Sequence, residues 1–422
     1  MGMTFAEKVL ARHAEKKQVQ PGEIVEIQPD VALSHDNTAA IIGIFQKMGA
    51  ETVFDASRLV IVLDHATPAP TTKHADNHRR IRAFVQEQGI GNFYKIGQGI
   101  CHQIMVEEGH ALPGEVIVGA DSHTTHAGVM GAFAVGIGRT EIASVWAIGR
   151  IWLRVPESLR VEAQGEFPPF TQAKDLALRA IGKLGADGAL YQSVEWHGTT
   201  VAAMGISQRA VLTNMMAEMG AKNAVIPPDG LTLLYLEGRA KRPFDVVSPD
   251  EDANYAERLE IDVSHLRPMI ACPHSVDHVR PVEEIAGTPI HQAFLGTCTN
   301  GRLEDLAVAA EILEGRRLHP RTRMIVIPAS ARIYLEAMKA GYLETLIRAG
   351  AVIGTPGCGP CMGNHMGVPA EGEVTISTAN RNFRGRMGTQ ESEIYLASPA
   401  VVAASAIAGE ITHPAEVVGG SS

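Results

Sequence analysis

Three of the five cysteines lie on glycine-rich turns, where their thiols could converge on one metal centre. Cys358 and Cys361 are three positions apart within segment 354–364, and Cys298 precedes Cys358 by sixty residues, in segment 296–301. The Cys-x-x-Cys spacing allows two sulfurs to bind one centre, and glycine allows backbone N–H groups to approach thiolate or sulfide closely. Three thiolates would fill three corners of a cubane cluster and leave one metal open to substrate. The spacing therefore predicts an open-corner iron–sulfur site.

The same thiols have other interpretations. Cys358 and Cys361 also have the spacing of a thioredoxin-type redox pair, although two glycines and a proline in segment 362–369 disfavour the helix that such a pair needs. A closed zinc site would require a fourth ligand, for which His365 is a candidate. Buried, unreactive cysteines are the third alternative. The spacing favours the cluster and leaves these three interpretations open.

Histidines and carboxylates recur just after predicted strands. Asp64 and His65 follow the apolar run 59–63, His102 follows the strand expected at 92–96, and Asp121 and His123 follow the strand expected at 115–118. Ligands of open α/β sheets bind at the carboxyl ends of strands. A carboxylate beside an imidazole fixes its tautomer and tunes its basicity, as acid–base catalysis near neutral pH requires. These five side chains therefore predict an acid–base site, although any one histidine alone would be an ordinary surface or core residue.

The elements that must position these residues alternate between strand and helix, which predicts an α/β fold with largely parallel sheets covered on both faces. The sequence predicts helices at 4–16, 39–47, 75–87, 140–151, 170–184, 207–219, 303–313, 331–340 and 398–408. Further strands are expected at 24–27, 159–163, 293–295, 324–327, 351–353 and 374–378, and around Glu195. The glycines of segment 128–138 lack the spacing of a dinucleotide loop and are interpreted as helix-packing residues. The charged, proline-broken segment 239–252 is interpreted as a linker.

An arginine loop follows the last of these predicted strands. Three strands, at 293–295, 351–353 and 374–378, end at the two cysteine turns and at the loop that carries Arg381 and Arg386. These arginines could be solvated loop charges. Beside a candidate cluster, however, two guanidinium groups are suited to bidentate capture of substrate carboxylates.

The composition limits the class of protein. A chain of 422 residues exceeds one ordinary core, so two or three domains are expected. The net charge of −10 and the absence of Lys/Arg blocks argue against nucleic-acid or anionic-membrane binding. Five cysteines form a sparse, odd set, which indicates a reducing cytoplasm rather than a disulfide framework. Segment 1–8 lacks an apolar signal core, and no stretch approaches the ~20 apolar residues of a membrane span.

Five motifs together resemble the aconitase superfamily of [4Fe-4S] hydro-lyases, and the likeness runs from the first predicted helix to the last. They are the segments 99–103, 121–123, 296–300, 354–361 and 380–388. Within that superfamily the chain is similar to the large subunits of 3-isopropylmalate dehydratase and homoaconitase. The resemblance implies a three-domain α/β/α iron–sulfur fold, with domains at 1–133, 134–284 and 285–422. It also implies that the swivelling fourth domain is missing from this chain and is supplied by a separate small subunit.

The resemblance also implies roles for individual residues. Cys298, Cys358 and Cys361 match the three ligands of a [4Fe-4S] cluster that has one open iron. The family's carboxylate–histidine pairs match Asp64 with His65, His102 with Asp121, and His123 with Glu195. From the residues alone Glu195 is equally well an exposed strand carboxylate. The residues that match substrate-binding positions are Arg381, Arg386, Asn380 and Ser122.

The implied reaction removes water from a hydroxy acid and adds it back at the neighbouring carbon. We expect the substrate to be 2-isopropylmalate, converted to 3-isopropylmalate in leucine biosynthesis. The alternatives are homoaconitase, in lysine biosynthesis, and methylmalate or dimethylmaleate hydro-lyases. The stretch His35 to Thr38 departs from the glutamine of aconitase proper, which disfavours citrate. A cluster-free RNA-binding role is an alternative of another class, and the acidic balance weighs against it.

Overall fold

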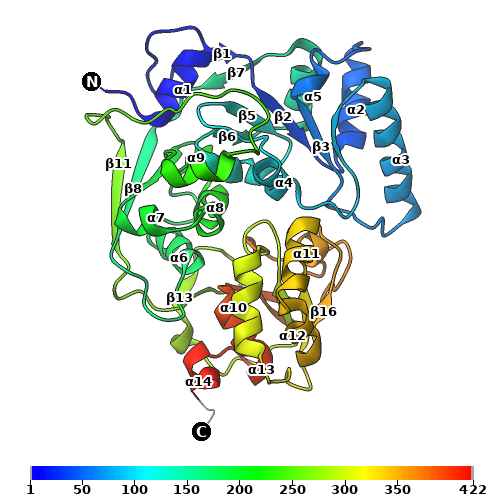
Figure 1. The fold of residues 1–422 in the computed structure, drawn as a ribbon, viewed down its shortest axis with the longest axis vertical. Helices are drawn as coiled ribbons and strands as arrows, with labels where there is room; N and C mark the ends of the chain where they lie inside the picture. The colour runs from blue at the N-terminus through cyan, green and yellow to red at the C-terminus, as the bar shows by residue number, and fades with distance from the viewer. Residues whose placement is uncertain (1, 420–422) are drawn as a thin grey trace.

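A computed structural model describes residues 2–419 of the protein (Figure 1). Its strands form three sheets of mainly parallel strands and one antiparallel pair, β1 (Ile24–Ile27) with β7 (Ile151–Arg154). Within the described range no helix combines the length and the apolar character needed to cross a membrane. The alternation of strands and helices predicted from the sequence is therefore present. It forms three α/β parts, each a sheet with its helices, that pack against one another.

The first sheet has five parallel strands in the order β4-β3-β2-β5-β6. Every residue of β2, β3 and β5 is buried, which shows that both faces of the sheet are covered. The strands are β2 (Val31–Ser34), β3 (Leu59–Val62), β4 (Asn92–Tyr94), β5 (Val116–Gly119) and β6 (Phe133–Gly136). The helices of this part are α1 (Phe5–His13), α2 (Thr38–Lys47), η1 (Ala56–Arg58), α3 (Thr72–Glu87), α4 (Cys101–Glu107), η2 (Ser122–Met130) and α5 (Arg139–Ile148).

The second sheet has four parallel strands in the order β10-β9-β8-β11. They are β8 (Ser158–Gln164), β9 (Ser193–His197), β10 (Asn223–Val225) and β11 (Glu257–Asp262). The helices of this part are α6 (Ala173–Leu184), α7 (Thr199–Ala203), α8 (Ile206–Met215), η3 (Met216–Met219) and α9 (Gly230–Leu236). Its apolar core continues into the third sheet, because Leu159 of β8, Phe294 of β14 and Leu396 of β18 belong to one buried cluster.

The third sheet has seven strands in the order β13-β12-β18-β17-β14-β15-β16. The five from β14 to β18 are parallel, and β12 and β13 are antiparallel to their neighbours. The strands are β12 (Met269–Ala271), β13 (Val279–Pro281), β14 (Gln292–Leu295), β15 (Arg323–Val326), β16 (Val352–Ile353), β17 (Val374–Ser377) and β18 (Glu393–Ala397). Its helices, coloured yellow to red in Figure 1, are η4 (Val282–Glu284), α10 (Leu303–Leu313), α11 (Ala331–Lys339), α12 (Tyr342–Ala349), η5 (Gly359–Met362), α13 (Pro399–Ala408) and α14 (Pro414–Val418).

The sheets do not follow the predicted domain boundaries in two places. Strand β6 crosses the boundary at 133/134 and completes the first sheet, since it pairs with β5. Strands β12 and β13 precede the boundary at 284/285, yet they pair into the third sheet through β18. Long-range strand pairing decides sheet membership, and it left no signal in the local composition at either boundary.

The glycines of segment 128–138 were wrongly predicted to pack between helices. The segment forms the end of η2 and strand β6. A Cβ added to Gly128 would lie 1.7 Å from the carbonyl oxygen of Ala224 in β10. This glycine therefore allows the first and second sheets to approach each other closely. The elements that were not predicted are helices α4, α7, α9, α12 and α14 and strands β2, β6, β7, β10, β11, β12, β13 and β18.

Candidate active site

The carboxyl ends of strands from the first and third sheets bring the predicted residues together. Asp64 and His65 follow β3 and Asp121 follows β5, on either side of β2, where the strand order reverses. That reversal is the position at which open α/β sheets bind ligands. The cysteine loop of the third sheet meets this edge directly, because the Cys358 N–H donates to the Asp64 carbonyl oxygen at 2.9 Å. The two groups of residues singled out in the sequence thus form one site.

Two of the three cysteines have hydrogen-bond donors at their sulfurs. The Asn214 amide nitrogen lies 3.2 Å from Cys298 Sγ, and the Asn380 amide nitrogen lies 3.5 Å from the same sulfur. Arg386 Nη2 lies 3.5 Å from Cys361 Sγ. Donors aimed at sulfur stabilise the thiolate form, the form that binds metal. The donor set therefore fits a thiolate-bound metal group or cluster.

Burial of the metal-free thiols acts in the opposite direction. Burial raises the pKa of Cys298 to about 12, and it also raises the pKa of Cys358 despite the opposing effect of His65. All the cysteines are free thiols, and Cys298 and Cys361 are buried. These buried thiols suit a positively charged metal group, because metal binding supplies the charge that holds thiolates in a dry interior.

The geometry disfavours two of the alternatives raised for these thiols. After Cys358 the chain makes only the short 3-10 turn η5, Gly359–Met362, rather than the helix that a thioredoxin-type pair requires. His365, the candidate fourth zinc ligand, places Nε2 3.2 Å from the His65 carbonyl oxygen. Its ring is therefore used in a contact with the loop after β3.

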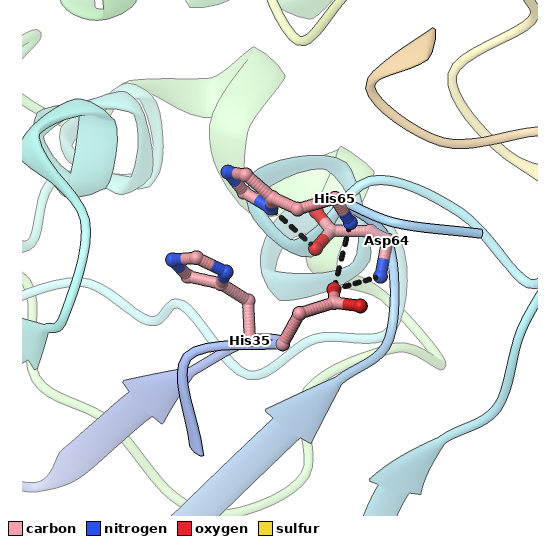
Figure 2. A group of neighbouring side chains, drawn as sticks. His35, Asp64 and His65 are labelled. Atoms are coloured by element: carbon pink, nitrogen blue, oxygen red, sulfur yellow. Dashed lines mark hydrogen bonds and ion pairs between the residues drawn. The ribbon is translucent and has the colours of Figure 1, made fainter. Parts of the chain in front are cut away.

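Histidines and carboxylates form a network next to Cys358, whose Sγ lies 3.9 Å from Asp64 Oδ2. Figure 2 shows three members of this network, His35, Asp64 and His65. His65 Nδ1 lies 2.7 Å from Asp64 Oδ1, and His102 Nε2 lies 2.8 Å from Asp121 Oδ1. His65 Nε2 lies 3.7 Å from Asp121 Oδ2, so this imidazole lies between two carboxylates. His35 stacks on His65 with ring centroids 3.7 Å apart. Asp64–His65 and His102–Asp121 thus pair as the resemblance implied.

The two stacked imidazoles have opposite electrostatic environments. Burial disfavours a charge on His65, but Asp64, the Cys358 thiolate and Asp121 outweigh it and raise the pKa well above the ordinary value. Burial and the neighbouring charge of His65 lower the pKa of His35 to about 4. At neutral pH the pair therefore holds one proton-rich ring and one neutral ring, an arrangement suited to proton delivery.

Asp36 hydrogen-bonds to the backbone of this network. One of its carboxylate oxygens accepts the N–H groups of Asp64 and His65 at 2.9 and 2.7 Å, and the other lies 2.7 Å from His78 Nε2. The possible ligand atoms of His35, Asp36, Asp64 and His65 lie within 4.8 Å of one another. Both oxygens of Asp36 are, however, already used by these donors, so its carboxylate holds the loop after β3 in place.

The predicted pairing of His123 with Glu195 is wrong. His123 Nε2 lies 2.7 Å from a carboxylate oxygen of Glu218. Glu195, in β9, accepts hydrogen bonds from the Phe5 N–H at 2.9 Å and from the Tyr255 hydroxyl at 2.9 Å. Its strand belongs to the second sheet, and these contacts connect that sheet to the first helix. Glu195 is therefore a buried structural carboxylate.

The arginine loop after β17 faces the network. Arg381 Nε donates to both oxygens of Glu218, at 2.8 and 3.0 Å, and its Nη2 donates to Ser122 Oγ at 2.8 Å. Burial alone would raise the pKa of Glu218, but the hydrogen bond from His123 and the charges of His123 and Arg381 lower it. Asn380 lies between Cys298 and Cys361, since its Oδ1 is 4.0 Å from Cys361 Sγ.

Several residues of the site were missed in the sequence. Asn214 and Glu218 lie four positions apart where α8 continues into η3, on the helical face that meets the site. Apart from Thr213 they are the polar residues of the mainly apolar stretch 210–219, and Glu218 is 8% exposed. That spacing was the available signal. His126 left no such signal, and its ring contacts the Asn214 amide nitrogen at 3.2 Å.

Comparisons with known proteins show which sequences this chain resembles. The sequence profile of the aconitase family (aconitate hydratase) matches residues 7–289 and 278–409. A 3-isopropylmalate dehydratase large subunit 1 from Methanopyrus kandleri is 52% identical over 98% of this chain and 99% of its own length. A probable methanogen homoaconitase large subunit from Methanothermobacter thermautotrophicus is 50% identical over 99% of both chains. A 3-isopropylmalate dehydratase large subunit from Aquifex aeolicus is 49% identical over 99% of this chain and 98% of its own length.

Proposed function

The chain belongs to the aconitase family, and on that premise we propose that it is the cluster-bearing large subunit of a hydro-lyase that interconverts 2-isopropylmalate and 3-isopropylmalate. The observation that carries the proposal is the meeting of two groups at one edge. One group is the three thiols, two of which have donors at their sulfurs, and the other is the carboxylate–imidazole network that contacts Cys358 through Asp64. A redox or structural role for the thiols would not require that network.

Cys298, Cys358 and Cys361 would hold a [4Fe-4S] cluster with one open iron. When bound, the cluster supplies a Lewis acid that polarises the hydroxyl group and an adjacent carboxylate of the substrate. Asn214, Asn380 and Arg386 would donate to the sulfurs.

His65 is the proposed acid for the departing hydroxyl. Asp64 fixes its tautomer through Nδ1, and the raised pKa keeps the ring protonated at neutral pH. Nε2 then faces Asp121, whose Oδ2 lies 3.7 Å away, beyond hydrogen-bond distance, so the Nε2–H group stays available to a substrate oxygen. His102 and His123 orient Asp121, because His102 Nε2 and the backbone N–H of His123 each lie 2.8 Å from its Oδ1.

Arg381 and Arg386 are the proposed carboxylate-binding residues. Within residues 2–419 the contacts of Arg381 use Nε and Nη2, which leaves Nη1 for a substrate carboxylate. Its attachment to Glu218 preorganises the guanidinium, so little conformational entropy is lost on binding. Ser122 and Asn380 complete the polar rim that faces the substrate.

A small subunit is the proposed partner, because the relatives named above are large subunits. It would supply the remaining groups that surround the substrate's side chain. Homocitrate is the second candidate substrate, since a homoaconitase relative is nearly as similar to this chain as the 3-isopropylmalate dehydratase relatives are.

Iron and acid-labile sulfide per chain, measured after anaerobic reconstitution, test the cofactor. About four of each are expected, and zinc without sulfide would overturn the proposal. The complex with the small subunit should then be assayed on isopropylmalate and on homocitrate. Turnover of homocitrate alone would reject the first substrate and support the second.

A further inference from the structure

A lysine is completely buried next to the candidate site. Lys174 lies in the first turn of α6 and has no exposed surface. Its ammonium donates to the carbonyl oxygens of Thr378, at 3.0 Å, and Ala379, at 2.5 Å, and it lies 3.6 Å from Met215 Sδ. Every one of these partners is uncharged.

This buried charge lacks a carboxylate in contact with it among residues 2–419. The neighbouring Asp175 is turned away, because its two oxygens accept the N–H groups of Met269 and Gln172 at 2.8 and 2.9 Å. A buried ammonium without an anionic partner is strongly destabilising. In the metal-free chain burial accordingly lowers the pKa of Lys174 to about 7.

The two carbonyl groups that Lys174 binds lie directly before Asn380 and Arg381. Thr378 also ties this segment to the first cysteine turn: its hydroxyl accepts the Gly296 N–H at 2.9 Å and lies 3.0 Å from the Gly296 carbonyl oxygen. Lys174 therefore lies where α6, a helix of the second part, meets the turn of Cys298 and the arginine loop after β17.

We infer that Lys174 is a positioning residue that fixes the arginine loop after β17, and that its ammonium is the internal counter-charge of the thiolate-bound cluster. The role of Lys174 as counter-charge rests on the proposed function. Three thiolates outweigh the charge of a [4Fe-4S]2+ core, so the loaded site is anionic and the metal-free site of neutral thiols is not. The cluster would thereby provide the partner that the buried ammonium otherwise lacks.

Two substitutions at Lys174 separate its positioning role from its role as counter-charge. Lys174→Met keeps the length of the side chain and removes both the charge and the donor. Lys174→Gln removes the charge and keeps a donor. Lys222→Met is the matched control, because Lys222 is a partly buried lysine that also donates to a backbone carbonyl, that of Gly136 at 3.4 Å, away from the cysteines.

The first quantity measured is the midpoint potential of the reconstituted cluster, with electron paramagnetic resonance as the method of detection. The second is the rate at which a chelator removes iron from the cluster. Both Lys174 variants are expected to show a lower potential and several-fold faster iron loss, because the more negative reduced cluster loses a nearby cation. Lys222→Met should match wild type. If the potential and the rate of iron loss are unchanged in both Lys174 variants, the counter-charge is rejected.

The third measurement is steady-state kinetics of the complex with the small subunit. Lys174→Met should raise KM for the hydroxy acid at least threefold, through displacement of the arginine loop, and Lys174→Gln should raise it less. An unchanged KM in Lys174→Met rejects the positioning role.

Thermal unfolding of the chains without a cluster tests whether a Lys174 variant has a folding defect. Both variants should melt within about 5 °C of wild type, because the lost hydrogen bonds are offset by removal of an uncompensated buried charge. A metal-free variant that does not fold would show that the ammonium is already compensated, which overturns the counter-charge. A wild-type chain that binds neither iron nor sulfide would instead reject the proposed function, and the counter-charge with it.

Discussion

Replacing Glu218 with glutamine is expected to remove most of the activity. The carboxylate lies 2.7 Å from His123 Nε2 and accepts contacts from Arg381 Nε at 2.8 and 3.0 Å. Glutamine keeps the volume, but it carries no charge and turns an N–H2 group toward one of the two donors. The imidazole and the guanidinium that face the substrate would both lose their fixed positions.

The size of the effect follows from these contacts. A hydrogen bond to a charged group contributes about 1.5–3 kcal/mol, and breaking a buried ion pair costs about 3–5 kcal/mol. Both partners of Glu218 face the site, so we expect about 3–5 kcal/mol less transition-state stabilisation. That loss corresponds to roughly two to four orders of magnitude in kcat/KM.

The matched control is Glu195→Gln, which changes the carboxylate that the sequence had placed in the site. Because Glu195 contacts Phe5 and Tyr255, this variant should melt at a lower temperature and keep kcat/KM within about twofold of wild type. The assay follows the ultraviolet absorbance of the unsaturated acid formed by the complex, with iron content checked for each variant. A large loss in Glu195→Gln and full activity in Glu218→Gln would refute the placement of both residues.

Further predictions concern the metal site, the packing and the pH response. Serine at any of the three thiols of the site should abolish iron and sulfide binding, whereas serine at Cys101 or Cys272 should not, as chemical analysis of reconstituted chains would show. Gly128→Ala should cost about 1–3 kcal/mol in urea unfolding, since its Cβ would meet a carbonyl oxygen at 1.7 Å, and equal stability to wild type would contradict this packing. Gly230→Ala meets no atom within 4 Å and should change stability by less than about 0.5 kcal/mol. Burial and two nearby cations lower the pKa of His110 to about 4, below its unfolded value, so stability should fall as the pH drops from 7 toward 4. His110→Gln should remove up to about 3 kcal/mol of that fall, and an unchanged pH dependence would show that another group is responsible.

Most strands and helices were predictable because their signals are local. The capping box of Thr4 and Glu7 begins α1, and the apolar run 59–63 forms β3 almost to the residue. Helix α4 was not predicted, because it begins directly after the glycine turn 97–99 and has only seven residues. Helix α12 was missed because it begins almost directly after α11, and strand β18 was missed because it has only five residues.

The sequence by itself determined which residues could do chemistry and at which edge of its own sheet each would lie. The thiols, the Asp–His motifs and the arginines each follow a strand, and parallel strands necessarily deliver their carboxyl ends to one side. The pairing of Asp64 with His65 is equally local, because the two residues are adjacent. These features need only the spacing along the chain and the direction of the strands.

Only the tertiary structure decided which distant groups complete the site. His123 contacts Glu218, 95 positions away, rather than the Glu195 that the resemblance had implied. Lys174 binds the chain 204 and 205 positions later. Such contacts depend on how the helices of the second sheet pack against the first and third parts. Side-chain periodicity indicates that a face is buried, but it does not indicate what covers that face. The reactive residues could therefore be identified from the sequence. The charged groups that hold them in place, Glu218 and Lys174, depended on how the three parts pack.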